Sequence, residues 1–317
     1  MKLSIIIPVY NVEEYVQDCI MSCINQDIPL DQYEIIAIND GSTDCSLDVV
    51  KRLAEKYSNI KIFSHQNQGP SVTRNAGIDL AAGDYIWFVD SDDTIEGNCL
   101  QRILNEVDGA DMLAFGCKDF KDGNQVGEFH YTIEGEELTG PGFVVAASSH
   151  FMHGVPFYLF RREFLQNTSH RFYPGIYHED TEFLVRIFME VALMRVSEGS
   201  YYHRSLRYGS ITRSVNPKRA FDALFVAQRV AEHIQSGQLQ NRERKAMQYL
   251  VPMIINNSLD AISNCSDEDV KKYNNHFCAN HLYEYFLTSK NVRYMIEGVA
   301  LMLFRNNPTY LYRKLKK

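Results

Sequence analysis

The chain has 317 residues, of which 45% are hydrophobic and 23% are charged, a composition typical of a soluble globular protein. It is long enough for one large domain or for two of ordinary size. Its 32 basic and 40 acidic residues give a net charge of −8, which argues against nucleic acid as a partner.

Two features of the sequence indicate where the protein resides. The seven cysteines form no Cys-x-x-Cys pair, and an odd number without a disulfide framework is typical of a reducing compartment. The start, Met1-Lys2-Leu3, lacks the basic and apolar stretches of a signal peptide, and no run of residues is long enough to span a bilayer. We therefore expect a cytoplasmic protein.

The first third of the chain alternates between strand and helix patterns. Residues 3–9 are apolar and β-branched, as in a strand that is buried on both faces. Residues 13–25 carry apolar side chains at helical spacing, with Asn11 as the candidate N-cap. The alternation continues through strands at 33–38, 60–64 and 84–89 and helices at 47–57 and 71–81. This order predicts a mainly parallel sheet with helices on both faces.

The pattern changes beyond residue 120. We expect a strand at 111–115, a hairpin around 121–124 that returns as a strand at 126–132, a short strand at 157–160 and a helix at 181–191. After Asn216-Pro217 the chain is helical almost throughout. We therefore place an α/β domain at residues 1–215 and a helical region at residues 216–317.

The strand predicted at 84–89 ends abruptly in three carboxylates, those of Asp90, Asp92 and Asp93. A strand that delivers acidic side chains at its C-terminal end places them in the crevice where open α/β sheets bind ligands. Like charges raise one another's pKa, and a divalent cation such as Mg²⁺ or Mn²⁺ would remove that conflict. The alternative is an acidic turn that caps a helix, and the segment alone does not separate the two.

Four segments together resemble glycosyltransferase family two, the nucleotide-sugar-dependent transferases with a GT-A fold. They are SIIIPVYN (4–11), INDGSTD (38–44), QGPSVTRNAG (68–77) and DSDD (90–93). The match covers roughly the first two-thirds of the chain, and Asn39-Asp40-Gly41-Ser42 stands where the family usually has Asp-Asp-Gly-Ser. The resemblance implies a Rossmann-like α/β fold of the GT-A type, in which helices flank a mainly parallel mixed sheet, with a helical C-terminal extension.

A nucleotide-sugar donor needs a base pocket, a ribose contact and a neutralised diphosphate. Pro8, Tyr10 and Asp40 follow neighbouring strands, and the Asp40 carboxylate suits the imide N–H of uracil or thymine. Its alternative role is an Asx-turn into the second helix. Glu13 either reaches the ribose or caps the first helix. Arg74 either contacts the diphosphate or base, as the resemblance favours, or lies on a solvated helix face.

The resemblance also assigns roles to the acidic segment. Asp92 becomes the principal metal ligand of the family's Asp-x-Asp element, and Asp90 contacts the ribose or the metal. Asp93 supports these ligands or faces the donor sugar. The expected cofactor is Mn²⁺ or Mg²⁺, which stabilises the charge on the departing nucleotide. His203 is a further candidate metal ligand, with a purely structural role as the alternative.

The family carries a Glu-Asp pair before an apolar helix, and its Asp deprotonates the acceptor hydroxyl. The resemblance assigns that role to Asp180. The alternatives are a helix cap at Asp180, or His178 as the base, because the ordinary pKa of histidine suits neutral solution. In the segment 201–212, Arg204 or Arg207 is expected to close over the diphosphate.

Residues 293–317 combine apolar side chains, among them Val299 and Leu303, with the basic stretch Arg313-Lys314-Leu315-Lys316-Lys317. This combination suits an anionic membrane surface, which here would be the inner face of the cell membrane. The alternative is a helix that packs on the core and ends in a solvated basic stretch. We expect the region 216–317 to contact the acceptor, a membrane surface or another subunit.

The sequence thus predicts an inverting, metal-dependent glycosyltransferase. It would move a sugar from a UDP- or dTDP-sugar to a hydroxyl of a saccharide or lipid-linked acceptor, in the synthesis of a bacterial surface polysaccharide. No Gln-x-x-Arg-Trp motif is present, which argues against a processive synthase. One alternative is a nucleotidyltransferase acting on sugar phosphates, which would need a Gly-rich basic loop at residues 8–11. Another is a nucleotide-sugar-binding protein without activity, against which the intact Asp90, Asp92 and Asp180 argue.

Overall fold

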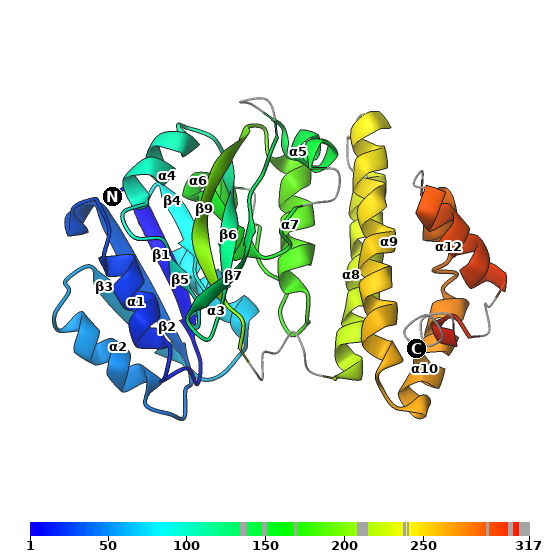
Figure 1. The fold of residues 1–317 in the computed structure, drawn as a ribbon, viewed down its shortest axis with the longest axis horizontal. Coiled ribbons are helices and arrows are strands. Elements are labelled where there is room, and N and C mark those ends of the chain that lie inside the picture. Colours follow the sequence, from blue (N-terminus) through cyan, green and yellow to red (C-terminus); the bar gives the residue numbers. More distant parts are fainter. Residues whose placement is uncertain are drawn as a thin grey trace. The chain divides into compact units, whose positions relative to one another are not determined.

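The computed structural model describes residues 1–133, 138–147, 151–167, 170–207, 215–236, 239, 241–289, 292–303 and 307–310 (Figure 1). Packing divides the chain into two units. The first comprises residues 1–140, 152–175 and 190–208, and the second comprises residues 141–151, 176–189 and 209–317.

The first unit is built on one sheet. Within the described residues it has nine strands in the order β3-β2-β1-β4-β8-β6-β9-β5, with β7 paired to β6. Strands β1 to β4 are parallel to one another, and β6 is parallel to β9. The antiparallel pairs are β4 with β8, β6 with β8, β6 with β7 and β5 with β9. The strands are β1 (Leu3–Val9), β2 (Tyr33–Asp40), β3 (Ile60–His65), β4 (Tyr85–Phe88), β5 (Thr94–Ile95), β6 (Met112–Lys121), β7 (Asn124–Phe129), β8 (Tyr158–Arg161) and β9 (Met194–Ser205).

The order of the parallel strands determines which edge of the sheet can bind a ligand. From β1 the chain moves outward to β2 and β3, and it then crosses back to β4 on the other side of β1. The register pairs Val9 with Asn39 and Ile6 with Phe88, so the carboxyl ends of β1, β2 and β4 lie at the same edge. The reversal makes a topological switch point between β1 and β4, where open α/β sheets bind ligands.

Helices flank this sheet, as predicted. Crossovers between parallel strands are right-handed as a rule, which assigns α1 and α2 to one face of the sheet and α3, which returns the chain in the opposite direction, to the other. In agreement, α1 contacts α2, and α3 contacts β1 and β2. The helices of the first unit are α1 (Val16–Ile24), α2 (Ser46–Ala54), α3 (Pro70–Leu80), α4 (Leu100–Val107) and α6 (Arg162–Asn167), with the 3-10 helices η1 (Leu30–Gln32) and η2 (Val155–Phe157).

One local prediction at the start of α1 is wrong. The helix begins at Val16, with Tyr15 rather than Asn11 as its N-cap residue. Asn11 instead has a positive φ of 51°, and its side-chain oxygen accepts a hydrogen bond from the Thr43 backbone N–H at 2.8 Å. The asparagine therefore joins the loop after β1 to the loop after β2.

The second unit is helical. It contains α5 (Gly140–Ala146), α7 (Glu179–Glu190), α8 (Pro217–Ser236), α9 (Asn241–Ser263), α10 (Asp267–Ala279), α11 (Glu284–Thr288) and α12 (Val292–Leu303). None of the helices in the described ranges has the length and apolar character needed to cross a membrane. The basic stretch at 313–317 lies outside the described residues.

A buried ion-pair network explains why α7 packs with the C-terminal helices. Glu182 of α7 has a side chain that is 1% exposed, and it pairs with Arg186 at 2.7 Å and with Arg229 of α8 at 3.1 Å. In packing, residues 141–151 and 176–189 therefore belong with the helical region. The division of roles at residues 215 and 216 stays a prediction.

The amino-terminal side of the sheet is held by a second buried carboxylate, that of Glu34 on β2. It accepts hydrogen bonds from the Ser4 hydroxyl at 2.6 Å and the Ala82 backbone N–H at 2.8 Å, and it pairs with Lys61 of β3 at 2.6 Å. Burial raises the pKa of Glu34, but the bonds from Lys61, Ser4 and Ala82 outweigh burial and leave the pKa below its ordinary value.

We expect Glu34→Gln to lower the free energy of unfolding by about 1–3 kcal/mol at neutral pH, because the ion pair is lost inside the protein. The lowered pKa means that this stabilisation is present above the ordinary pKa and is lost as pH falls through the folded-state value. Urea unfolding at neutral and acidic pH measures both effects. The exposed Glu55→Gln is the control, and an equal effect of the two substitutions would contradict the prediction.

Candidate active site

The acidic segment lies at the switch point, directly after the buried strand β4. A turn follows in which the Asp93 backbone N–H donates to the Asp90 carbonyl oxygen at 3.0 Å. The chain then enters β5, which pairs with β9 through Thr94 and His203. The sheet therefore fixes both ends of the turn that carries the three carboxylates.

Asp90 faces the cation on α3 that the sequence singled out. The Arg74 guanidinium donates to Asp90 Oδ1 at 2.9 Å. Arg74 is 5% exposed, and its guanidinium lies 5.5 Å from the centre of the Phe172 ring. Arg74 is thus not on a solvated helix face, since it is buried beside the acidic segment with its charge compensated.

Asp92 has a different partner, Arg207, which follows β9. The Arg207 guanidinium donates to Asp92 Oδ2 and lies 4.4 Å from the centre of the Tyr15 ring. Burial and the charge of Asp90 raise the pKa of Asp92, and Arg207 opposes them only in part. The pair with Arg207 therefore does not fully offset the cost of burying the Asp92 carboxylate.

Asp93 is the most buried of the three carboxylates. It accepts hydrogen bonds from the Tyr202 hydroxyl and the Ser205 backbone N–H, both at 2.7 Å. Burial, followed by the charges of Asp90 and Asp92, raises the pKa of Asp93 to about 8. Asp93 therefore carries a proton for much of the time near neutral pH, and it links the turn to β9.

His203 and Arg204 have partners elsewhere on the sheet. His203 Nε2 lies 2.8 Å from Glu96 Oε2, and Arg204 forms a bidentate pair with Asp119 at 2.8 and 2.9 Å. Of the two arginines expected near the diphosphate, Arg207 is the one that reaches the acidic segment. The role of His203 as a metal ligand stays a prediction.

The ends of β1 and β2 bring the other donor-binding candidates to the same edge. Pro8 is half-buried and Tyr10 is 47% exposed. The buried Asp40 carboxylate accepts from the backbone N–H groups of Gln68 at 2.7 Å and Gly69 at 2.9 Å. Asp40 thus clamps the loop before α3, and its Oδ1 also lies 3.3 Å from His65 Nδ1.

Asn39 and Glu13 both stabilise the start of helix α2. Asn39 makes the turn into α2, because its side-chain oxygen accepts from the Ser42 backbone N–H at 3.1 Å. The Glu13 carboxylate accepts from the backbone N–H of Cys45, the N-cap residue of α2, at 2.7 Å. Glu13 therefore caps the second helix and not the first, while its ribose contact stays a prediction.

The candidate bases belong to the second unit. Asp180 lies in the first turn of α7, where the helix dipole favours an ionised carboxylate. His178 precedes the helix with a positive φ of 64°. Burial and the charge of Arg219 lower the pKa of His178, so this imidazole is mostly neutral at neutral pH.

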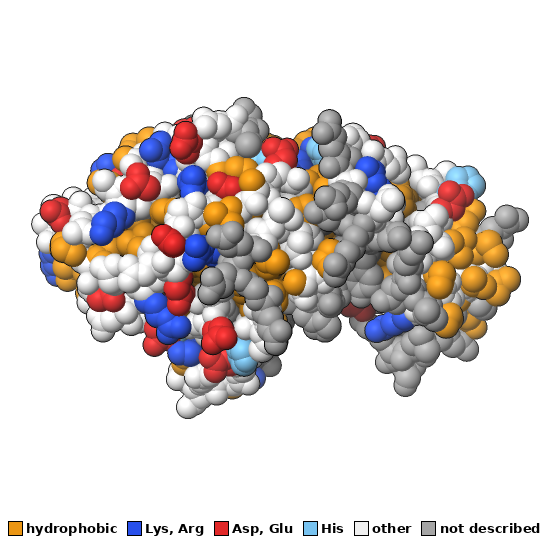
Figure 2. Space-filling model, turned by 90° about the horizontal axis from the view of Figure 1, so that it is seen from above, with side chains coloured by type: hydrophobic (Ala, Val, Ile, Leu, Met, Phe, Trp, Pro, Cys, Tyr) orange, Lys and Arg blue, Asp and Glu red, His pale blue; other side chains and the backbone are white. Residues whose placement is uncertain are grey.

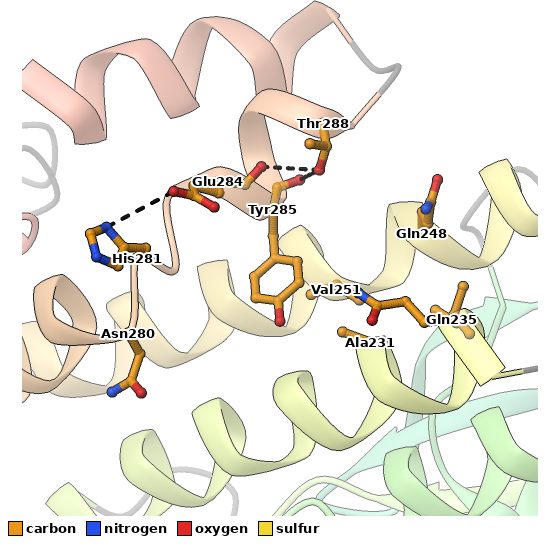
Figure 3. Close-up of a pocket in the computed structure, with 10 residues that line it drawn as sticks. Ala231, Gln235, Gln248, Val251, Asn280, His281, Glu284, Tyr285 and Thr288 are labelled. Carbon is orange, nitrogen blue, oxygen red and sulfur yellow. Dashed lines mark hydrogen bonds and ion pairs between the residues drawn. The ribbon is translucent and has the colours of Figure 1, made fainter.

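A pocket of about 330 Å³ also lies within the second unit, among α8, α9 and the segment that contains α11 (Figure 3). Tyr285 points into it, and amide side chains such as Gln235 and Gln248 line it. None of the predicted site residues contributes to its lining.

Three further residues complete the acidic site without belonging to a recognisable motif, namely Tyr15, Tyr202 and Ser205. Tyr202 and Ser205 come near Asp93 only because β9 lies beside β5 and β6. That pairing joins segments about a hundred residues apart, and no local pattern marks it. The alternation of Tyr202 with Arg204 along β9 was the only available signal.

The residues fit a divalent cation that also binds phosphate. In the part of the chain that the structure describes, no group of three or more His, Cys, Asp or Glu side chains is arranged to hold a metal ion. Two carboxylates are however partly exposed: the Asp90 side chain is 37% exposed and the Asp92 side chain is 28% exposed. Mg²⁺ sites usually combine one or two carboxylates with substrate phosphates.

Comparisons with known proteins agree with the sequence resemblance. Residues 4–173 match the model of glycosyl transferase family 2. The uncharacterized glycosyltransferase YibD of Escherichia coli is 31% identical over 220 residues, which cover 67% of this chain and 63% of that protein. A GalNAc(5)-diNAcBac-PP-undecaprenol beta-1,3-glucosyltransferase of Campylobacter jejuni is 30% identical over 217 residues, which cover 67% of this chain and 65% of that protein. The chain thus spans less than two thirds of either relative.

The fold is also that of a solved structure. S. aureus TarS 1–349 in complex with UDP-GlcNAc superposes with a TM-score of 0.75 at 21% identity, over 98% of this chain and 89% of that chain. This likeness confirms the predicted fold, a mixed and mostly parallel sheet of the GT-A type flanked by helices, with a helical C-terminal region.

The raised pKa of Asp93 has a measurable consequence in protein treated with EDTA. Between the ordinary pKa of Asp and about 8 the folded protein holds a proton that the unfolded chain releases, so stability falls as pH rises. Asp93→Asn cannot titrate. Its unfolding free energy relative to wild type should therefore rise by roughly 1 kcal/mol per pH unit over this window.

Urea unfolding at several pH values measures this difference, with the exposed Asp84→Asn as the control. Parallel stability curves for Asp93→Asn and wild type would mean that Asp93 is already ionised in the folded protein.

Proposed function

The chain belongs to glycosyltransferase family 2, and we propose that it transfers a sugar from a UDP- or dTDP-sugar to a hydroxyl of a saccharide or lipid-linked acceptor, with inversion at the anomeric carbon. The observation that carries the proposal is the position of Asp90, Asp92 and Asp93 at the switch point, beside the two guanidinium groups of Arg74 and Arg207.

The donor would lie along the carboxyl edge of β1, β2 and β4. Pro8, Tyr10 and Asp40 would meet the base there, and Glu13 or Asp90 the ribose. Arg74 and Arg207 would supply positive charge for the diphosphate. Each arginine is held beside a carboxylate, and a bound cation would neutralise that carboxylate instead of the arginine. The guanidinium group would then be free to bind a phosphate oxygen. The UDP-GlcNAc in the TarS structure supports a uridine nucleotide.

Asp92 and Asp90 would hold Mn²⁺ or Mg²⁺ together with the diphosphate oxygens, and His203 is a third candidate ligand. When bound, the metal supplies Lewis acidity that stabilises the negative charge on the leaving nucleotide. Asp93 touches the sheet through Tyr202 and Ser205, and it would keep the turn in place while facing the donor sugar.

The acceptor hydroxyl needs a base, and we assign this role to Asp180. Its carboxylate takes the hydroxyl proton while the oxygen attacks the anomeric carbon, and the bond between that carbon and the diphosphate breaks on the opposite side. The first turn of α7 favours the ionised form of Asp180 that this step requires. His178 is the second candidate.

The acceptor would be a saccharide or a lipid-linked saccharide in the synthesis of a bacterial surface polysaccharide. The C. jejuni relative, named for an undecaprenol-linked acceptor, supports this class. The protein would then work on the cytoplasmic side of the membrane.

We expect Asp92→Asn to reduce sugar transfer by about a hundredfold or more, because the metal ligand and its charge are lost. The assay measures nucleoside diphosphate released from the donor, since release of pyrophosphate would instead indicate a nucleotidyltransferase. Asp84→Asn is the matched control. Near-normal transfer by Asp92→Asn would remove Asp92 from the proposed site.

Asp180→Asn should reduce transfer to a similar extent, about a hundredfold or more, yet leave the affinity for UDP with Mn²⁺ unchanged. Calorimetry and the transfer assay separate the two effects. If His178→Gln abolishes transfer while Asp180→Asn does not, the base is His178 and the assignment is wrong.

A further inference from the structure

Helix α12 has apolar side chains on two opposite faces. On one face Tyr294 and Leu301 are 7% and 0% exposed. Gly298 lies between them, and a Cβ there would come within 2.8 Å of Phe286 Cβ, so this face packs closely on α11. The other face carries five apolar side chains that are 38 to 73% exposed, those of Met295, Ile296, Val299, Met302 and Leu303.

These five side chains, which we call the α12 outer face, are concentrated on one helix. They make up five of the thirteen large hydrophobic side chains that are exposed in the described part of the chain. Single exposed apolar residues are normal on a protein surface, whereas a contiguous group marks an interaction site. Figure 2 shows hydrophobic side chains gathered at the end of the second unit where Figure 1 places α12.

The charge of the surrounding sequence identifies the kind of partner. Residues 293–317 contain one acidic residue, Glu297, in a chain whose net charge is −8. Glu297 accepts a hydrogen bond from the Asn256 side chain of α9 at 3.0 Å, so it is engaged with its own unit. The same stretch contains six basic residues, namely Arg293, Arg305, Arg313, Lys314, Lys316 and Lys317.

We propose that the α12 outer face lies on an anionic lipid surface, to which the basic composition of the sequence 293–317 attracts the protein. An amphipathic helix inserts its apolar face at the boundary of headgroups and acyl chains, and lysine and arginine beside it attract anionic lipid. This inference is independent of the chemistry proposed for the acidic site.

The basic residues of the sequence 293–317 argue against a second copy of the chain as the partner of the α12 outer face. A second copy of the chain would meet this face with the same face, because a two-fold interface joins identical patches, and it would bring two basic stretches together.

Flotation of the full chain with vesicles tests the proposal. Wild type should float with vesicles of phosphatidylcholine mixed with phosphatidylglycerol, and not with phosphatidylcholine alone. The double variant Ile296→Asp/Leu303→Asp should lower the bound fraction at least about tenfold. Lys314→Glu/Lys316→Glu should also lower the bound fraction, and added salt should lower the bound fraction of wild type in the same way. Val126→Asp, an exposed apolar position on β7, is the matched control and should float like wild type.

Light scattering and thermal melting of the same proteins without vesicles complete the test. The proposal requires unchanged mass and unchanged melting temperature for Ile296→Asp/Leu303→Asp, together with unchanged hydrolysis of the donor. Failure of wild type to float, equal flotation by the α12 variant, or a dimer that this variant dissociates would each overturn it. A lower melting temperature of the variant would show that the protein itself covers the face, which is also incompatible with the proposal.

Discussion

The site depends on the partial burial of three carboxylates that the chain delivers within one turn after β4. Arg74 and Arg207 neutralise Asp90 and Asp92 from α3 and from the segment after β9, while hydrogen bonds from Tyr202 and Ser205 hold Asp93. Burial, and after it the charge of neighbouring carboxylates, still raises the pKa of Asp92 and of Asp93. The turn, which the sheet fixes at both ends, therefore holds two partly exposed carboxylates, those of Asp90 and Asp92, that suit a cation with its phosphate ligand.

The topology explains why these carboxylates lie at the edge of the sheet where a nucleotide can bind. The reversal of strand order between β1 and β4 opens the sheet at the carboxyl edge, and the loops that follow β1, β2 and β4 meet there. Asp40 contributes by holding the loop before α3 through two backbone N–H groups. Arg74 follows on that helix, so the clamp at Asp40 and the charge pair at Asp90 position the same element from its two sides.

Local patterns predicted the parallel half of the fold well. Strand β1 has the predicted bounds, and β2, β3 and α3 differ from the predicted ranges by one or two residues. The helix α4 was not predicted although Leu100, Ile103 and Val107 have helical spacing, and the strand β9 was not predicted either. For the candidate site, the acidic segment and Arg74 were predicted from the sequence, and the structure brings Arg74 to Asp90, while their roles stay predictions. The choice of Arg207 over Arg204, and the anchoring of Asp93 by Tyr202, follow from strand pairing between distant segments, which no local motif encodes.

The central claim is that the acidic turn binds a divalent cation together with a nucleoside diphosphate. The most direct measurement is a calorimetric titration of UDP and of dTDP into the wild-type protein, in Mn²⁺ and in EDTA. The account predicts binding of at least one of them in Mn²⁺ that weakens about tenfold or more in EDTA. Equal affinity for the nucleotide in the two solutions, or no heat of binding in Mn²⁺, would contradict it.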